Sequence, residues 1–312
     1  MARSARTKRD FLRLTDLDRS ELLDLLERAA EWKLLGKGGP RPLERMTIGL
    51  VFEKASTRTR VSFEVAAFQL GANTMMLSPR DTQLGRGEPI RDTARVLARY
   101  LDCLVVRTFG HDTLEEMARF ADVPVVNALT DASHPCQLLA DLLTITERFG
   151  ADALAKGGLS IAWIGDGNNM ANSWLEACAL LGFDLRLACP EGYDPDPALL
   201  ARTSGRARVV RAPREAAEGA HVVNTDVWAS MGQEGEAAER QRRFAGFIVD
   251  DALLRVARPD AIVLHCLPAH RGEEIAEDVL EGPQSAVFDE AENRLHAQKA
   301  LLELLLQESM TG

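Results

Sequence analysis

Four consecutive polar residues, from Ser56 to Thr59, lie directly after an apolar, β-prone run that begins at Ile48. The apolar residues that follow, up to Leu70, have helical spacing, so this stretch predicts a strand, a turn and a helix. The hydroxyl groups, the Arg58 guanidinium and the backbone N–H groups of the first helical turn would converge at the positive end of the helix dipole. Such donors suit a phosphate dianion. A capped helix with a solvated arginine is the alternative, but the position directly after a buried strand favours a phosphate site.

Other residues with useful chemistry lie where predicted strands end or predicted helices begin. Arg107, Asp226 and Cys266 each come at the end of a predicted strand, and His134 and Gln137 open a predicted helix. Open α/β sheets place ligand groups at the carboxyl ends of their strands, so these residues are candidates for a site. Each has an ordinary alternative: a surface arginine, a structural histidine, or a cysteine that serves as a small buried hydrophobe.

A glycine-containing turn, residues 165–169, joins a predicted strand to a helix and carries half of a dinucleotide-binding fingerprint. Met170 stands where the third glycine belongs, and no acidic residue ends the next strand. NAD binding is therefore a weak alternative, and we expect no cofactor. The side-chain amides of Asn168 and Asn169 suit the head group of an amino acid instead.

Strands and helices alternate along the chain, which predicts parallel sheets with right-handed crossovers. A length of 312 residues allows two domains of about 150 residues, each with its own core. Glycines and small residues gather at residues 150–158, where we place the boundary. We predict an α/β fold with two doubly wound parallel-sheet domains, residues 1–150 and 151–312, and the active site in the cleft between them. A leucine-rich C-terminal helix is expected to pack back on the first domain.

The composition is that of a soluble globular protein, with 46% hydrophobic and 27% charged residues. No apolar run approaches the roughly 20 residues of a membrane span. The net charge of −10 argues against broad nucleic-acid binding. Five scattered cysteines without a CxxC pair indicate reduced thiols in the cytosol, and the basic N-terminus lacks the apolar region of a secretory signal. We expect a cytoplasmic protein with no metal site and no nucleic-acid or membrane partner.

Five separated motifs resemble those of the carbamoyltransferase family and follow the family's order. They are Ser-Thr-Arg-Thr at 56–59, His-Pro-Cys-Gln at 134–137, Asp-x-x-x-Ser-Met-Gly at 226–232, His-Cys-Leu-Pro at 265–268 and Ala-Glu-Asn-Arg at 291–294. The resemblance covers nearly the whole chain. It implies that the first domain binds carbamoyl phosphate and the second binds an amino-acid acceptor.

The resemblance assigns roles to the matching residues. Arg107 and His134 would donate hydrogen bonds to the carbonyl oxygen of carbamoyl phosphate, and Gln137 would accept one from its NH2 group. Gln83 would reach the carbamoyl phosphate of a neighbouring subunit, which implies a homo-oligomer, in this family a trimer with active sites at the subunit interfaces. The implied carbamoyl phosphate ligands are Ser56, Thr57, Arg58, Thr59, Gln83, Arg107, His134, Gln137, Cys266, Leu267 and Arg294.

The Asp-x-x-x-Ser-Met-Gly and His-Cys-Leu-Pro motifs are typical of the family members that use ornithine. They imply transfer of the carbamoyl group to the δ-amino group of L-ornithine, giving L-citrulline and phosphate in arginine biosynthesis. We expect no covalent intermediate on Cys266, because His265 should point to the opposite face of its strand. The implied catalytic residues are Arg107, His134, Asp226 and Cys266, and the implied ornithine ligands are Asn169, Asp226, Ser230 and Met231.

Two alternatives stay open at this point. The acceptor could be a related amine such as putrescine or N-acetylornithine, or the chain could be a non-catalytic paralogue that keeps the fold. Two polar stretches also lie outside the motifs. The charged run of residues 236–243 is expected to be a solvated helix face, and the motifs do not account for the polarity of residues 270–274.

Overall fold

The chain forms two compact units in the computed structural model, which describes residues 8–54, 56–78, 87–229 and 234–311. The first unit comprises residues 1–140 and 293–312, and the second comprises residues 141–292. The division falls within two helices, α5 (Pro135–Phe149) and α13 (Val287–Thr311), so each of them contributes to both units. The domain boundary at residue 150 stays a prediction.

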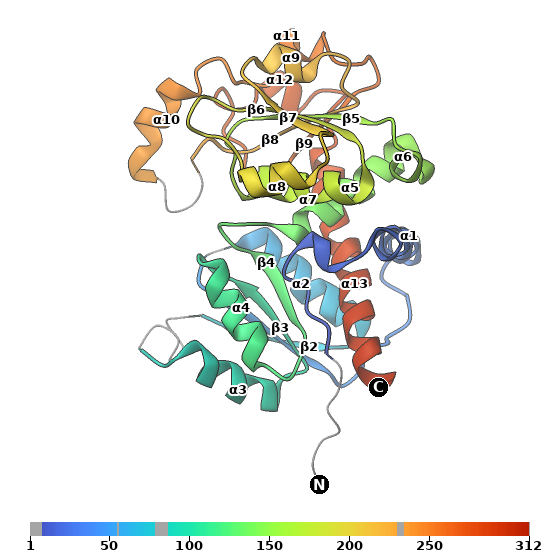
Figure 1. The fold of residues 1–312 in the computed structure, drawn as a ribbon. Helices are drawn as coiled ribbons and strands as arrows, with labels where there is room; N and C mark the ends of the chain where they lie inside the picture. Colours follow the sequence, from blue (N-terminus) through green and yellow to red (C-terminus); the bar gives the residue numbers. More distant parts are fainter. Residues whose placement is uncertain (1–7, 55, 79–86, 230–233, 312) are drawn as a thin grey trace. The chain divides into compact units, whose positions relative to one another are not determined.

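The first unit is built on a four-stranded parallel sheet in the order β2-β1-β3-β4. The strands are β1 (Thr47–Phe52), β2 (Asn73–Leu77), β3 (Cys103–Arg107) and β4 (Val125–Leu129). The remaining helical elements of this unit are η1 (Leu14–Asp16), α1 (Arg19–Leu35), α2 (Thr57–Leu70), α3 (Ile90–Tyr100) and α4 (His111–Phe120). Helices α3 and α4 lie side by side against the sheet (Figure 1), and their apolar residues share a core with β1 and β3.

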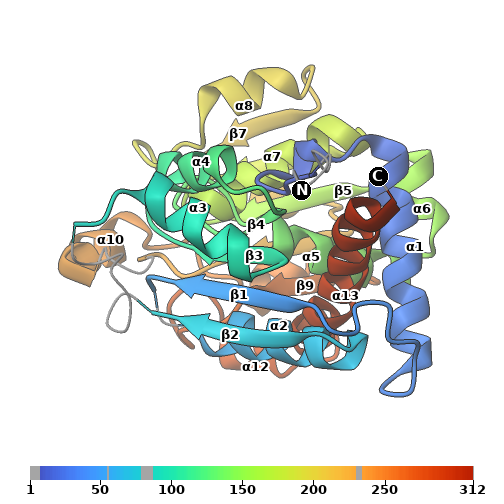
Figure 2. The same cartoon turned by 90° about the horizontal axis from the view of Figure 1, so that it is seen from below.

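Helix α1 runs beside α13 (Figure 2), and hydrogen bonds fix the two helices together. The carboxylate of Glu303 accepts from Arg28 at 2.8 Å and from the indole N–H of Trp32 at 2.8 Å. Trp32 is almost fully buried, so its polar N–H group needs this partner.

The second unit is built on a five-stranded parallel sheet in the order β7-β6-β5-β8-β9. The strands are β5 (Ser160–Ile164), β6 (Asp184–Ala188), β7 (Ala207–Val210), β8 (Val222–Thr225) and β9 (Ile262–His265). The helices are α6 (Asp152–Lys156), α7 (Asn169–Leu181), α8 (Pro197–Arg202), α9 (Pro213–Ala217), η3 (Glu234–Glu236), α10 (Ala237–Arg243), α11 (Asp251–Leu254) and α12 (Glu277–Leu280). Figure 1 shows α9, α11 and α12 on one face of this sheet and α7 and α8 on the other.

Each sheet changes winding direction at one point, and the candidate ligand residues of each unit follow the strands at that unit's own point. In the first sheet the chain moves from β1 to the edge strand β2 and then to β3 on the other side of β1. In the second, it moves outward from β5 through β6 to β7 and then returns to β8 beside β5. Ligands of open α/β sheets bind beyond the carboxyl ends of the strands at such points.

The prediction of two parallel α/β sheets is confirmed. Sequence reasoning missed strand β2, because it is an edge strand whose side chains are all partly or fully exposed. Its apolar residues are only Met75, Met76 and Leu77, too short a run to predict a strand by itself. Among the described residues, no helix is both long enough and apolar enough to cross a membrane.

We expect Gly167→Ala to destabilise the second unit. The backbone of Gly167 lies so close to the segment after β6 that an added Cβ atom would fall 2.2 Å from the backbone nitrogen of Pro195. Because a backbone neighbour cannot rotate away, the free energy of unfolding should fall by about 3 kcal/mol. Urea unfolding would measure this change. Gly38→Ala, where a Cβ meets nothing within 4 Å, is the matched control and should stay close to wild type.

Candidate active site

The predicted phosphate turn opens helix α2 directly after β1. Ser56 is the N-cap residue, and its Oγ atom accepts a hydrogen bond from the backbone N–H of Thr59 at 3.2 Å. Thr57 is exposed, Arg58 is half-buried and Thr59 is buried. The 14-residue helix places its first-turn N–H groups and these side chains at one end, as the sequence predicts. This turn can therefore hold an anion.

Arg294 ties this turn to two other elements of the first unit. From helix α13, its Nη2 atom donates to Thr59 Oγ1 at 2.8 Å, and its Nη1 atom donates to Gln137 Oε1 at 2.9 Å. The guanidinium is buried. The structure thus brings together three predicted carbamoyl phosphate ligands from α2, α5 and α13.

Arg107 and His134 are the two predicted donors to the carbonyl oxygen. Arg107 is the last residue of β3, His134 immediately precedes α5, and both are buried. Burial lowers the pKa of His134 well below its usual value, and the positive charges of Arg294 and Arg107 lower it further. His134 is therefore neutral at physiological pH. A neutral imidazole still offers one N–H donor, which is what a developing oxyanion needs.

The lowered pKa of His134 predicts an acid-dependent loss of stability. Below pH 6.5 the unfolded chain binds a proton at His134 that the folded chain does not, so the free energy of unfolding falls as the pH falls. Between pH 7.5 and pH 5.5 this residue should account for about 1 kcal/mol of the loss. Urea unfolding at the two pH values should show that His134→Gln has a correspondingly smaller pH dependence. An unchanged dependence would contradict the lowered pKa.

In the second unit, Asp226 is a buried carboxylate directly after β8. Its Oδ2 atom accepts from Asn168 Nδ2 at 3.1 Å, and its Oδ1 atom accepts from the backbone N–H of Val227 at 2.8 Å. Asn168 is itself fixed, because its side-chain oxygen caps the N-terminus of α7. The turns after β5 and β8 therefore orient one carboxylate, whose charge suits a substrate ammonium group.

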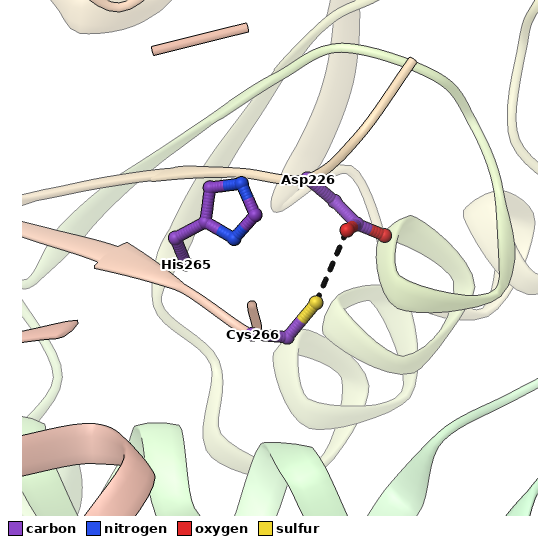
Figure 3. A group of neighbouring side chains, drawn as sticks. All are labelled: Asp226, His265 and Cys266. Atoms are coloured by element: carbon purple, nitrogen blue, oxygen red, sulfur yellow. Dashed lines mark hydrogen bonds between the residues drawn. The ribbon is translucent and has the colours of Figure 1, made fainter. Parts of the chain in front are cut away.

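Cys266 lies next to Asp226 (Figure 3), and its Sγ atom donates a hydrogen bond to Asp226 Oδ1 at 3.1 Å. Burial raises the pKa of the Cys266 thiol well above its usual range, and the neighbouring carboxylate raises it further. Cys266 is therefore a neutral thiol at physiological pH. Because the thiolate is the nucleophilic form, this environment does not favour a covalent intermediate.

His265 lies closer to Cys266 than strand alternation predicts. Ligand atoms of Asp226, His265 and Cys266 lie within 4.8 Å of one another (Figure 3). The expectation that His265 points away from Cys266 is wrong, because β9 ends at His265 and the alternation does not continue into Cys266. Both ring nitrogens nevertheless bond elsewhere: Nε2 lies 3.0 Å from Glu274 Oε1, and Nδ1 lies 2.9 Å from the backbone nitrogen of Leu267.

Glu274 accounts for part of the polar segment that the motifs leave unexplained. It is fully buried, and its Oε1 atom accepts from His265 Nε2 and, at 2.6 Å, from the backbone N–H of His270. The His265 ring then accepts from Leu267, whose backbone has a left-handed φ of 57°. Glu274 thus supports the conformation of Leu267 through His265. Sequence reasoning missed Glu274, because nothing in the sequence distinguishes it from the adjacent Glu273.

Among the described residues, two groups hold possible metal-ligand atoms close together. They are Asp226, His265 and Cys266, and His270, Glu273 and Glu274. In the first group both ring nitrogens and both carboxylate oxygens take part in hydrogen bonds within the protein. In the second, the histidine is exposed and the buried carboxylate already bonds His265. We assign neither group to a metal.

The other predicted site residues stand as follows. Asn169 is the first residue of α7, next to Asn168. Gln83, Ser230 and Met231 lie outside the described residues. Cys266 and Leu267 belong to the second unit and the phosphate turn to the first, so their predicted contact with carbamoyl phosphate stays a prediction.

Comparisons with known proteins match both units. Residues 9–147 match a family model described as the carbamoyl-P binding domain of aspartate/ornithine carbamoyltransferase, and residues 157–305 match the Asp/Orn binding domain of the same family. The chain is 54% identical to an ornithine carbamoyltransferase from Pelobacter propionicus, over 96% of this chain and 98% of that protein. It is 56% identical to an anabolic ornithine carbamoyltransferase from Pseudomonas aeruginosa, over 96% and 97%. The crystal structure of ornithine carbamoyltransferase from Thermus thermophilus aligns with a TM-score of 0.88 at 46% identity, over 96% of this chain and 99% of that one.

Proposed function

Because the chain belongs to the aspartate/ornithine carbamoyltransferase family, we propose that it transfers the carbamoyl group of carbamoyl phosphate to the δ-amino group of L-ornithine, giving L-citrulline and phosphate. The observation that carries this proposal is the identity of about 54% to ornithine carbamoyltransferases over nearly the full length of both chains. The geometry at Asp226 supports it, since a fixed buried carboxylate suits a cationic amino acid.

In the proposed reaction the first unit binds the donor substrate. The first turn of α2 and Arg58 hold the phosphate, whose charge they also stabilise as it leaves. Arg107, His134 and Thr59 donate to the carbonyl oxygen, which gains negative charge when the amine attacks. Loss of one such donor typically costs about 10²- to 10³-fold in rate.

The second unit binds the acceptor. The δ-nitrogen of ornithine must lose a proton before it attacks, because only the neutral amine has a free electron pair. The attack forms the new C–N bond and moves the carbonyl π electrons onto the oxygen, giving a tetrahedral intermediate. The bond from this carbon to the phosphate oxygen then breaks, phosphate leaves with the electron pair, and it takes up the second proton that the attacking nitrogen must lose. Asp226 and the neutral thiol of Cys266 orient the amine and assist the loss of its proton. Holding both substrates close together supplies the remaining rate acceleration through proximity.

The direct test is an assay for citrulline with carbamoyl phosphate and L-ornithine supplied together. We expect citrulline and phosphate in equal amounts. Putrescine and N-acetylornithine in place of ornithine test the acceptor, and both should react far more slowly. Tight carbamoyl phosphate binding without product from any amine would favour the non-catalytic alternative.

We also propose that the reaction serves arginine biosynthesis in the cytoplasm. Similar proteins from Pseudomonas aeruginosa and Campylobacter jejuni are named anabolic ornithine carbamoyltransferases. The five described cysteines are all free, which agrees with a reducing compartment.

A homotrimer with Gln83 reaching the neighbouring active site is part of the same proposal. Large apolar side chains are exposed on α2 and on the edge strand β2, which pack against each other. Val61 is 50% exposed, Phe68 73% and Met75 50%. Val61 and Phe68 lie two helical turns apart on α2, whereas Met75 belongs to the sheet face that packs against α3 and α4. The exposed apolar pair on α2 fits a surface that another chain covers.

Phe68→Glu should weaken the proposed trimer, since a buried charge without a partner disfavours association. Light scattering after size-exclusion chromatography should show a smaller particle, and activity should fall because Gln83 would no longer reach its neighbour. Leu34→Glu, which changes an apolar residue that is 89% exposed on α1, is the control and should keep the wild-type mass. A wild-type chain that is monomeric and fully active would contradict the trimer.

A further inference from the structure

Arg240 is buried, although it lies in a charged run predicted to be a solvated helix face. It belongs to α10 and is 5% exposed, whereas Glu239, Arg242 and Arg243 of the same helix are exposed. Burial of a guanidinium is costly unless charges and hydrogen bonds compensate it. The prediction of a solvated face is therefore wrong for this residue.

The partners of Arg240 come from the ends of two strands. Its Nη1 atom donates to Asp166 Oδ2 at 2.6 Å and to the backbone oxygen of Trp228 at 2.8 Å. Its Nε atom lies 3.2 Å from a carboxylate oxygen of Glu236, and the guanidinium lies 5.0 Å above the ring of Tyr193. Asp166 follows β5, and Trp228 follows β8.

These contacts complete a closed set of interactions around Asp226. Asp166 lies two residues before Asn168, and Trp228 lies two residues after Asp226. The hydrogen bond from Asn168 to Asp226 joins the two turns on one side, and Arg240 joins them on the other. The turn that carries the Asp226 carboxylate is thus bonded to a guanidinium from helix α10.

Arg240 also balances charge. Asp166 and Asp226 are both buried carboxylates, and the Asp226 charge acts on Asp166. Burial raises the pKa of Asp166, and the hydrogen bond from Arg240 offsets part of that rise. Without Arg240, Asp166 would repel Asp226 or take up a proton, and the Trp228 carbonyl would lose its donor.

We propose that Arg240 is a positioning residue for the amine site, which fixes the turn that carries Asp226 and neutralises Asp166 without touching the substrate. The inference rests on the proposed function, since it takes Asp226 as the residue that receives the ornithine amine. It adds a residue outside the recognised motifs to the acceptor site.

Steady-state kinetics of Arg240→Gln would test this proposal, with Arg243→Gln on the same helix as the control. Arg243 is exposed and lies 4.0 Å from Glu239, so its loss should leave the kinetics unchanged. For Arg240→Gln we expect KM for ornithine to rise about tenfold and KM for carbamoyl phosphate to stay within about twofold. Equal changes in both constants, or none, would overturn the proposal.

Two further variants separate positioning from a loss of folding. The double variant Asp166→Asn with Arg240→Gln removes the uncompensated carboxylate. Its KM for ornithine should therefore be lower than that of Arg240→Gln alone and closer to the wild-type value. Arg240→Lys keeps the charge but not the planar fork, so its KM should lie between those of wild type and Arg240→Gln. Failure of both variants to improve on Arg240→Gln would overturn the charge-balancing role.

The alkylation rate of Cys266 gives a readout that does not depend on turnover. The Cys266 thiol donates to Asp226, and the other four cysteines are buried. If Arg240 fixes Asp226, Arg240→Gln should speed alkylation of Cys266 by iodoacetamide at least about threefold, because the carboxylate that raises the thiol pKa becomes displaced. The Arg243→Gln rate should equal that of wild type. A wild-type chain that makes no citrulline would refute the proposed function, whereas equal alkylation rates in all three proteins would refute the role of Arg240.

Discussion

Replacing Asp226 with asparagine is expected to lower kcat/KM for L-ornithine by about a thousandfold, the largest effect we predict for any acceptor residue. The substitution removes the negative charge that would bind the amine. It also disrupts the local hydrogen bonds, because the Asp226 oxygens accept from Asn168, Cys266 and Val227. An asparagine side chain has one acceptor oxygen and one NH2 group, so its NH2 group would face at least one of these three donors.

Kinetics with each substrate varied in turn would measure this effect, and binding of carbamoyl phosphate alone should change little. Asp194→Asn is a suitable control in the same unit, since Asp194 is largely exposed and pairs with Arg211. Asp226→Asn should also speed alkylation of Cys266, because loss of the carboxylate removes one cause of the raised thiol pKa. If ornithine KM and kcat both stayed at wild-type values, Asp226 would not be the amine ligand.

The parts of the site that sequence reasoning located depend on local order along the chain. The phosphate turn is an example, because strand, N-cap residue and helix follow one another within 25 residues of sequence and the Ser56 cap bonds Thr59 three residues away. Asp226 is another example, because it directly follows the buried strand β8. A residue in that position lies at the carboxyl end of the parallel sheet, where ligands bind, whatever the order of the strands.

The parts that were missed depend on contacts between distant segments. The sequence of α10 predicts that Arg240 is exposed to solvent. Its burial becomes favourable through the Asp166 carboxylate and the Trp228 carbonyl, which come from distant segments. In the sequence, Glu274 does not differ from its neighbour Glu273. The structure distinguishes it by its hydrogen bond with the ring of His265. Hydrophobic periodicity reports which face of an element is apolar, but not which polar groups meet in the folded chain.

Family resemblance identified Arg294 as a site residue without predicting its hydrogen bonds. The motif at 291–294 marks Arg294 as a carbamoyl phosphate ligand, but it does not predict that this guanidinium bonds Thr59 and Gln137. Thr59 and Arg294 are separated by 235 residues. These hydrogen bonds hold the hydroxyl of Thr59 and the side-chain amide of Gln137 in fixed positions.

Arg58→Gly is expected to weaken carbamoyl phosphate binding by about a hundredfold or more, which corresponds to the loss of a charge-assisted contact with the phosphate. Arg58 lies in the first turn of α2, where its guanidinium adds a permanent charge to the helix N-terminus. The matched control is Arg60→Gly, because Arg60 lies in the same turn but is half-exposed and pairs with Glu64 at 2.9 Å. Both variants place a glycine in the same helix, so any general weakening of α2 is common to them. Calorimetric titration with carbamoyl phosphate should therefore show a large loss for Arg58→Gly and a small one for Arg60→Gly. If the two variants bound carbamoyl phosphate equally, the effect would come from the helix, and Arg58 would not be the phosphate ligand.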